Sequence, residues 1–175
     1  MGNKIIVYTT RHGASESVAL RISRETNYTI VSEKEFNGSS DDAEVLFVAP
    51  IYMGAVFGLD SLVKKLNKSN KVKLTIVTIG LYDPNRESNV ENIRNHVESS
   101  LADSTIVLLN LFSIRGKLDM KKLSFTQKML IKALYNKAKK ADVKNRTENE
   151  QDIIKAVEEN DALYFPQLDE IIQSI

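Results

Sequence analysis

Residues 9–15 form a polar loop whose side chains and backbone suit a bound phosphate group. The loop reads Thr-Thr-Arg-His-Gly-Ala-Ser and lies between an apolar run at 4–8 and a helical pattern that starts at Ala14. Free N–H groups at a helix start, together with the helix dipole, attract a dianion. Gly13 lets the backbone turn tightly against such a ligand. The predicted phosphate cradle consists of Thr10, Arg11, His12, Gly13, Ala14 and Ser15.

The same loop has a second interpretation that needs no ligand. Ser15 or Thr10 could cap the helix with its hydroxyl group, as serine and threonine commonly do. The loop lacks the Gly-x-Gly-x-x-Gly pattern of dinucleotide sites and the Gly-Lys-Ser/Thr ending of nucleoside triphosphatases. Its position after the first strand of a doubly wound sheet favours phosphate binding over capping alone.

Two later loops carry residues that suit a flat aromatic ring. Tyr52 and Tyr82 can stack on a ring, while Gly54 and Gly80 let backbone amides reach its polar edge. In the alternative interpretation, both tyrosines only cover the edge of the sheet. The predicted ring contacts are Pro50, Tyr52, Met53, Gly54, Gly80, Leu81 and Tyr82. No carboxylate pair or histidine dyad near them suggests a general base, so the catalytic residues are left unassigned.

Composition limits the classes of protein to which this chain can belong. Its 175 residues suffice for a single domain over 1–175, and 42% hydrophobic content excludes a disordered chain. The absence of cysteine excludes disulfides, thiolate nucleophiles and iron–sulfur clusters, and two histidines make a metal site improbable. The sequence shows neither a signal peptide nor a membrane-spanning run, so we expect a cytoplasmic protein.

Five short apolar runs alternate with helical patterns along the chain. Apolar residues recur at helical spacing over 14–26, 59–66, 90–101 and from 166 onward. This alternation predicts parallel βαβ units, with helices on both faces of one sheet and ligands at the carboxyl ends of its strands. The strands are predicted at 4–8, 28–31, 45–49 (ended by Pro50), 72–79 and 105–112.

Residues 115–165 are too long for a plain strand-to-helix connection and are predicted to be an insertion, whose basic segment is 115–146. The segment holds eleven Lys or Arg residues and two acidic ones, for a net charge of +9, whereas the rest of the chain carries −8. A single amphipathic helix is predicted over 120–140, with leucines at 123, 130 and 134 opposite a basic stripe. The residues of that stripe are Lys121, Lys128, Lys132 and Lys139.

Three interpretations of this basic helix remain open. It could contact an anionic membrane surface peripherally, at the inner face of the cell membrane. It could attract the propionate groups of a tetrapyrrole substrate. In the third interpretation its leucines pack on the domain and the lysines are only solvated. Nucleic acid is not expected as a partner, because the acidic remainder of the chain would repel phosphates.

The three loops and the basic insertion resemble those of flavodoxin-like FMN proteins, and most closely the menaquinone-dependent protoporphyrinogen oxidase family. The run Thr-Arg-His-Gly-Ala-Ser at 10–15 is similar to the Thr-Arg-x-Gly-x-Thr loop of that family, and Ala-Pro-Ile-Tyr-Met-Gly at 49–54 to its second flavin loop. The resemblance implies a doubly wound α/β fold with a five-stranded parallel sheet in the order 2-1-3-4-5. It also implies FMN as cofactor and oxidation of protoporphyrinogen IX to protoporphyrin IX in haem biosynthesis, with a quinone as acceptor.

Two rival functions stay open at this stage. A flavodoxin-type electron carrier without its own substrate would fit the acidic charge outside the basic segment. A flavodoxin-like domain that has lost its flavin is the other alternative, and the intact first loop argues against it.

Overall fold

Five apolar runs form one parallel sheet in the computed structural model, which describes residues 3–116, 118–159 and 166–175. β-branched residues favour the extended backbone of these strands. The strands lie in the order β2-β1-β3-β5-β6, and each neighbouring pair along this path is parallel. This confirms the predicted fold class and strand order. The strands are β1 (Lys4–Tyr8), β2 (Thr29–Ser32), β3 (Glu44–Tyr52), β5 (Lys73–Gly80) and β6 (Val107–Arg115).

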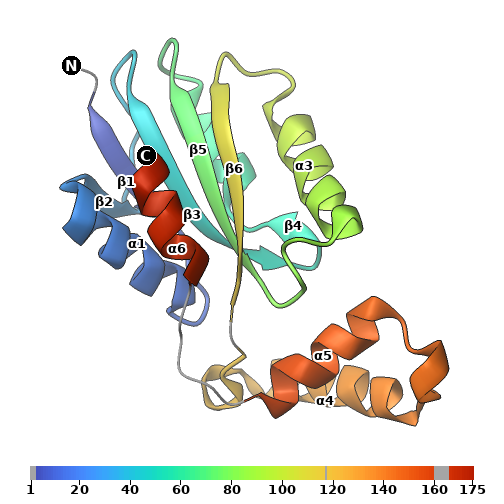
Figure 1. Cartoon of the computed structure of the whole chain (residues 1–175). Helices are drawn as coiled ribbons and strands as arrows, with labels where there is room; N and C mark the ends of the chain where they lie inside the picture. The colour runs from blue at the N-terminus through green and yellow to red at the C-terminus, as the bar shows by residue number, and fades with distance from the viewer. Residues whose placement is uncertain (1–2, 117, 160–165) are drawn as a thin grey trace.

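Helices cover both faces of the sheet, as Figure 1 shows. On one face α1 and α6 bury residues such as Ile22 and Leu168 against the strands. On the other face α2 and α3 bury Leu62 and Val97. The apolar stripes that predicted these helices therefore become their buried sides. The helices are α1 (Ala14–Thr26), α2 (Leu59–Leu66), α3 (Glu87–Leu101) and α6 (Pro166–Ser174).

The third strand does not end at Pro50, contrary to the prediction. β3 continues to Tyr52, and Pro50 is paired with Ile79 of β5. The neighbouring strand β1 stops opposite Val48, and a short antiparallel strand, β4 (Ala55–Val56), pairs with the end of β3. Phe57, just after β4, donates its N–H to the Pro50 carbonyl at 3.0 Å. Pro50 acts here only as an acceptor, so its missing N–H is tolerated.

The last strand also extends beyond its predicted end. β6 runs from Val107 to Arg115, whereas the sequence pattern predicted a strand over 105–112. The polar Ser113 looked like a strand end, but its hydroxyl lies 2.9 Å from that of Thr78 on β5. Ile114, the next residue, is fully buried. The first residue of the predicted basic segment, Arg115, therefore still belongs to the sheet.

After β6 the chain leaves the sheet at the carboxyl ends of the strands and forms a helical hairpin, residues 118–159 (Figure 1). Helix α5 packs against α4 and extends the hairpin beyond residue 146. None of the helices in the described ranges is long and apolar enough to cross a membrane. The hairpin contains η1 (Met120–Lys122), α4 (Phe125–Lys140), η2 (Val143–Asn145) and α5 (Glu148–Glu158).

The predicted single helix over 120–140 is wrong at its start. Lys121 lies in η1, and α4 begins only after Ser124. Ser124 and Gln127 form a capping box, in which each side chain bonds the backbone of the other residue. Such a motif starts a helix at a fixed residue. Lys121 therefore does not share a continuous helical stripe with Lys128.

Candidate functional site

The first loop joins β1 to α1 and leaves the start of that helix uncapped. Gly13 occupies the N-cap position with a φ of 87°, a left-handed conformation that glycine adopts readily. Its N–H donates to the Thr10 hydroxyl at 2.9 Å, which closes the turn. No side chain of the described residues caps the helix. The first helical hydrogen bond runs from Ser17 to Gly13, so the N–H groups of residues 14–16 lack helical acceptors.

Ser15 is the one residue of this loop whose side chain is fully enclosed. It is only 1% exposed, and its Oγ has no hydrogen-bond partner within the described ranges. Ser15 lies inside α1 rather than at its N-cap, so its hydroxyl does not act as the predicted alternative cap. A buried polar group left without a partner costs about 1–3 kcal/mol. A phosphate group fits this arrangement, because its oxygens accept hydrogen bonds from a hydroxyl and from helix N–H groups.

Arg11 brings a positive charge from the first loop to the aromatic residues of the second. The carbon at the centre of its guanidinium group lies 3.9 Å from the ring centroid of Tyr52 and 5.0 Å from that of Phe57. The two rings meet edge to face, with centroids 6.4 Å apart. Arg11 is exposed and His12 is half-buried. Tyr52, predicted to stack on a flat ring, therefore already has the guanidinium group over one face.

A tight turn shapes the second loop. Met53 and Gly54 connect β3 to β4, and both have positive φ values, 50° and 82°. Two successive residues with positive φ are typical of a two-residue hairpin turn. Met53 is 86% exposed at its tip. The predicted contact residues Pro50 and Tyr52 belong to β3, so only the two turn residues form the loop between the strands.

Gly58 joins the first two loops and was not among the predicted site residues. A Cβ atom added at Gly58 would lie 3.1 Å from Thr9 Cγ2, a tight contact that would push Thr9 of the first loop by a few tenths of an ångström. Its φ of 85° also favours glycine. A signal was available in the sequence, because Gly58 directly precedes the apolar stripe of α2 that begins at Leu59.

The third loop follows β5 and lies beside the second. An added Cβ at Gly80 would contact the Ile51 side chain at 3.6 Å, which places the two loops next to each other. The Gly80 carbonyl accepts a hydrogen bond from Gly116 N–H at 2.6 Å. Leu81 is half-buried, and Tyr82 is exposed. The fold thus brings the three predicted loops together at the carboxyl edge of the sheet.

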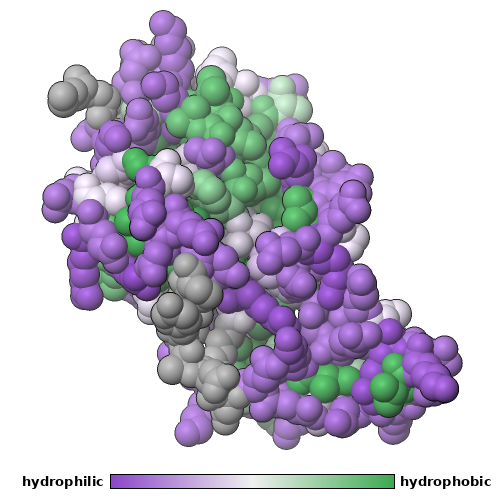
Figure 2. Space-filling model, in the orientation of Figure 1, coloured by the Kyte–Doolittle hydropathy of each residue, from purple (hydrophilic) through white to green (hydrophobic). Residues whose placement is uncertain are grey.

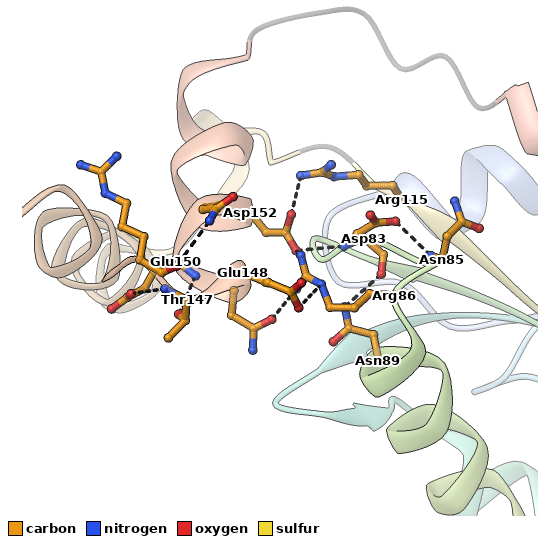
Figure 3. A network of polar contacts seen from close by, with 12 residues as sticks. Asp83, Asn85, Arg86, Asn89, Arg115, Thr147, Glu148, Glu150 and Asp152 are labelled. Atoms are coloured by element: carbon orange, nitrogen blue, oxygen red, sulfur yellow. Dashed lines mark hydrogen bonds and ion pairs between the residues drawn. The ribbon is translucent and has the colours of Figure 1, made fainter. Parts of the chain in front are cut away.

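A buried carboxylate ties the helical hairpin to the third loop (Figure 3). Asp152 of α5 is 5% exposed and accepts a hydrogen bond from Asp83 N–H at 3.1 Å. It also forms ion pairs with Arg86 at 2.9 Å and Arg115 at 3.4 Å. Arg86 binds a second carboxylate of α5, Glu148, at 2.9 Å. Sequence patterns did not indicate this network, because its members come from three distant segments.

The structure separates the four lysines that were predicted to form one basic stripe. Lys121 lies in η1, whereas Lys128, Lys132 and Lys139 lie on α4. Lys128 is half-buried and Lys132 is exposed. Lys139 pairs with Glu158 of α5 at 2.9 Å, and this contact raises the pKa of the Lys139 ammonium group. Lys139 therefore holds the two hairpin helices together rather than standing free.

Comparison with solved structures returns proteins of low sequence identity, several of them described as flavoproteins. A flavoprotein in complex with FMN from Lactobacillus acidophilus is 11% identical, with a TM-score of 0.48, over 65% of this chain and 93% of that chain. The Trp repressor binding protein from Bacillus subtilis is 9% identical, with a TM-score of 0.44, over 90% and 99%. A flavodoxin from the domain Archaea is 9% identical, with a TM-score of 0.40, over 63% and 82%.

The match to a protein family covers most of the chain. Among proteins with curated descriptions, none matches the sequence. The family model described as "Flavodoxin domain" matches residues 5–145, which include all three loops and the strands that carry them. The chain therefore belongs to the flavodoxin domain family.

Proposed function

We propose that this flavodoxin domain binds FMN and acts as an oxidoreductase. The observation that carries the proposal is the buried Ser15 hydroxyl without a partner, next to the uncapped start of α1. Membership of the flavodoxin family supports FMN as the ligand. When bound, FMN supplies two-electron redox chemistry, while the protein contributes binding, orientation and electrostatics.

Each loop has a distinct part in this proposal. The Ser15 hydroxyl and the N–H groups of residues 14–16 donate hydrogen bonds to the phosphate, and the Arg11 guanidinium group adds positive charge beside it. The turn at Met53 and Gly54 and the loop at 80–82 flank the flavin ring. The contact of Gly58 with Thr9 links the second loop to the first, and that of Gly80 with Ile51 links the third to the second, which supports one continuous binding site.

The proposed reaction is the oxidation of protoporphyrinogen IX to protoporphyrin IX with a quinone as acceptor. In each of three rounds the substrate loses two electrons and two protons, and one quinone takes up both to become the quinol. The resemblance of the loop at 10–15 to the menaquinone-dependent oxidases supports this substrate. The lysine-rich hairpin beside the loops also supports it, because the substrate carries two propionate groups.

Electron transfer without a dedicated substrate is the second candidate. Outside residues 115–146 the chain carries a net charge of −8, and an acidic surface suits docking to a basic redox partner.

Anaerobic spectroscopy tests the proposal and separates the two candidates. Protein loaded with FMN is mixed with protoporphyrinogen IX in the absence of oxygen, and the flavin absorption is followed. The oxidase proposal predicts bleaching of the flavin, then recovery when a menaquinone analogue is added. A carrier would leave the flavin oxidised with protoporphyrinogen but accept electrons from a chemical reductant. Protein that takes up no FMN at all would overturn both candidates.

A further inference from the structure

The outer side of α4 exposes a set of large apolar side chains to solvent. Figure 2 shows hydrophobic patches over the hairpin, bordered by hydrophilic surface. Apolar side chains exposed in this number within one short segment mark a surface that contacts a partner or a membrane. We call this set, together with the lysines between them, the α4 outer face. Its apolar residues are Phe125 (77% exposed), Met129 (54%), Leu130 (53%) and Leu134 (38%).

The packing of the hairpin leaves this face free. Helix α4 contacts α5 through Tyr135, whose hydroxyl donates to Glu158 at 2.8 Å, and through the fully buried Ala138. Within the described ranges, the ion pairs between the hairpin and the sheet domain come from Asp152 and Glu148 of α5, and none comes from α4. Of the three leucines that the third interpretation packs on the domain, Leu123 is buried, whereas Leu130 and Leu134 are exposed. That interpretation therefore fails for the leucines of α4.

The charge around these apolar residues has one sign. Seven lysines and no acidic residue lie between Met120 and Ala141. Of these lysines, only Lys122 and Lys139 form ion pairs with residues that the structure describes. Lys132, Lys137 and Lys140 are exposed and share the outer side of α4 with Phe125 and Met129. At 100° per residue, the three lysines fall at angles between and beside the apolar residues of the face.

We propose that the α4 outer face docks on an anionic phospholipid bilayer. An interfacial helix places apolar side chains in the headgroup layer and lysines next to the lipid phosphates. A nucleic acid would account for the lysines but not for the exposed Phe125 and Met129. Each lysine near an anionic surface strengthens the partitioning by about fivefold. The hairpin is attached at the carboxyl edge of the sheet, so docking brings the three loops toward the lipid.

Docking has a functional consequence that rests on the proposed function. A quinone dissolves in the bilayer, and the hairpin would hold the FMN site close to that acceptor. The docking itself requires no flavin, so lipid binding can be measured with and without FMN. Loss of flavin binding and loss of lipid binding are therefore separate results.

Co-sedimentation with vesicles tests the docking. The full chain is mixed with vesicles of phosphatidylglycerol and phosphatidylcholine, or of phosphatidylcholine alone. We expect wild-type protein to pellet with the anionic vesicles and to stay in solution with the neutral ones. The combined change K132Q, K137Q and K140Q should lower the partition coefficient by about a hundredfold. The pair F125S and M129S should also release the protein from anionic vesicles, at unchanged charge.

Matched variants distinguish lipid binding by the α4 outer face from a general effect of positive charge. Lys34, Lys64 and Lys68 are exposed lysines of the sheet domain, and changing all three to glutamine removes the same charge. This control should bind anionic vesicles as wild type does, and circular dichroism should show every variant folded. Equal binding by control and α4 lysine variants would overturn the proposal. The proposal would also be overturned if wild-type protein bound neither type of vesicle and the double change F125S and M129S dissociated a dimer in solution.

Discussion

Ser15 lies in the first turn of α1, where its side chain is buried and its hydroxyl has no partner in the described part of the chain. Two neighbouring serines thus differ in role. The Ser17 hydroxyl donates to the Gly13 carbonyl at 2.9 Å and is exposed. Ser15 has no such local bond, and it lies in the first turn of α1 beside N–H groups that lack helical acceptors. A phosphate bound at this helix start would give the Ser15 hydroxyl an acceptor.

Replacing Ser15 by alanine should therefore raise the stability of the apo protein and lower its affinity for FMN. The apo protein should become more stable by about 1 kcal/mol, because a buried hydroxyl without a partner is removed. The dissociation constant for FMN should rise about tenfold, because a hydrogen bond to a charged oxygen is lost. Thermal unfolding of the apo protein and fluorescence titration with FMN measure the two effects.

The variant S17A is the control for this prediction. Its exposed hydroxyl bonds only the helix backbone, so both quantities should stay close to wild type. If S15A destabilised the apo protein and left FMN affinity unchanged, Ser15 would have a structural role only.

Gly58 provides a second prediction, on the contact between the first two loops. An alanine there would press its Cβ against Thr9 Cγ2 at 3.1 Å and would also strain a φ of 85°. Gly54 has nearly the same φ, 82°, but open space around an added Cβ. Both G54A and G58A should lose about 1 kcal/mol of stability to backbone strain. G58A should weaken FMN binding more than G54A, measured by titration, because G58A also displaces Thr9 of the first loop.

A loss of FMN affinity of the same size in both variants would show that the Thr9 contact is irrelevant to the site.

Polar contacts from α5 hold the helical hairpin to the sheet domain in the described part of the chain. Asp152 contributes the buried ones, from α5 to the third loop and to the end of β6. Glu148 binds the same Arg86 but is largely exposed, with 71% of its side chain accessible. Exposed ion pairs contribute little to stability, whereas breaking a buried one leaves a charge without compensation. The attachment of the hairpin should thus depend on Asp152 far more than on Glu148.

The variant D152N tests this difference. Loss of the carboxylate should cost about 3 kcal/mol at the attachment and speed amide hydrogen exchange in α5 and in residues 81–86. Exchange in the central strands β3 and β5 should stay slow. The matched variant E148Q should change exchange in neither segment. Equal exchange rates in D152N and wild type would show that other contacts hold the hairpin.

The whole molecule is an α/β domain that carries one lysine-rich helical hairpin at the edge where its three loops meet. The helix faces could be predicted, because apolar periodicity reports burial directly. The strand order followed from the resemblance of the loops to those of flavodoxin-like proteins. The β3–β4 turn could not be predicted, because a proline in the sequence indicates the end of a strand. Pro50 is accommodated within β3 because the neighbouring strand β1 stops opposite Val48. The Asp152 network could not be predicted either, because it depends on contacts between segments 37 and 69 residues apart.

The candidate site, like the fold, could be predicted from the sequence only in part. The loop at 10–15 was found from residue types and from its place after the first strand. Gly58 and Phe57 were missed, since their roles depend on contacts with Thr9 and Arg11 that only the folded chain creates. The break between Lys121 and α4 was also missed, because the periodic pattern runs across the capping box at Ser124.

Calorimetric titration of the apo protein with FMN and with riboflavin is the most direct measurement of the central claim, that the start of α1 holds a phosphate. The two ligands share the flavin ring and differ only in the phosphate group. FMN should bind at least about a hundredfold more tightly, since its phosphate adds two or more charge-assisted hydrogen bonds. Equal affinities for the two ligands, or no binding of either, would contradict the account.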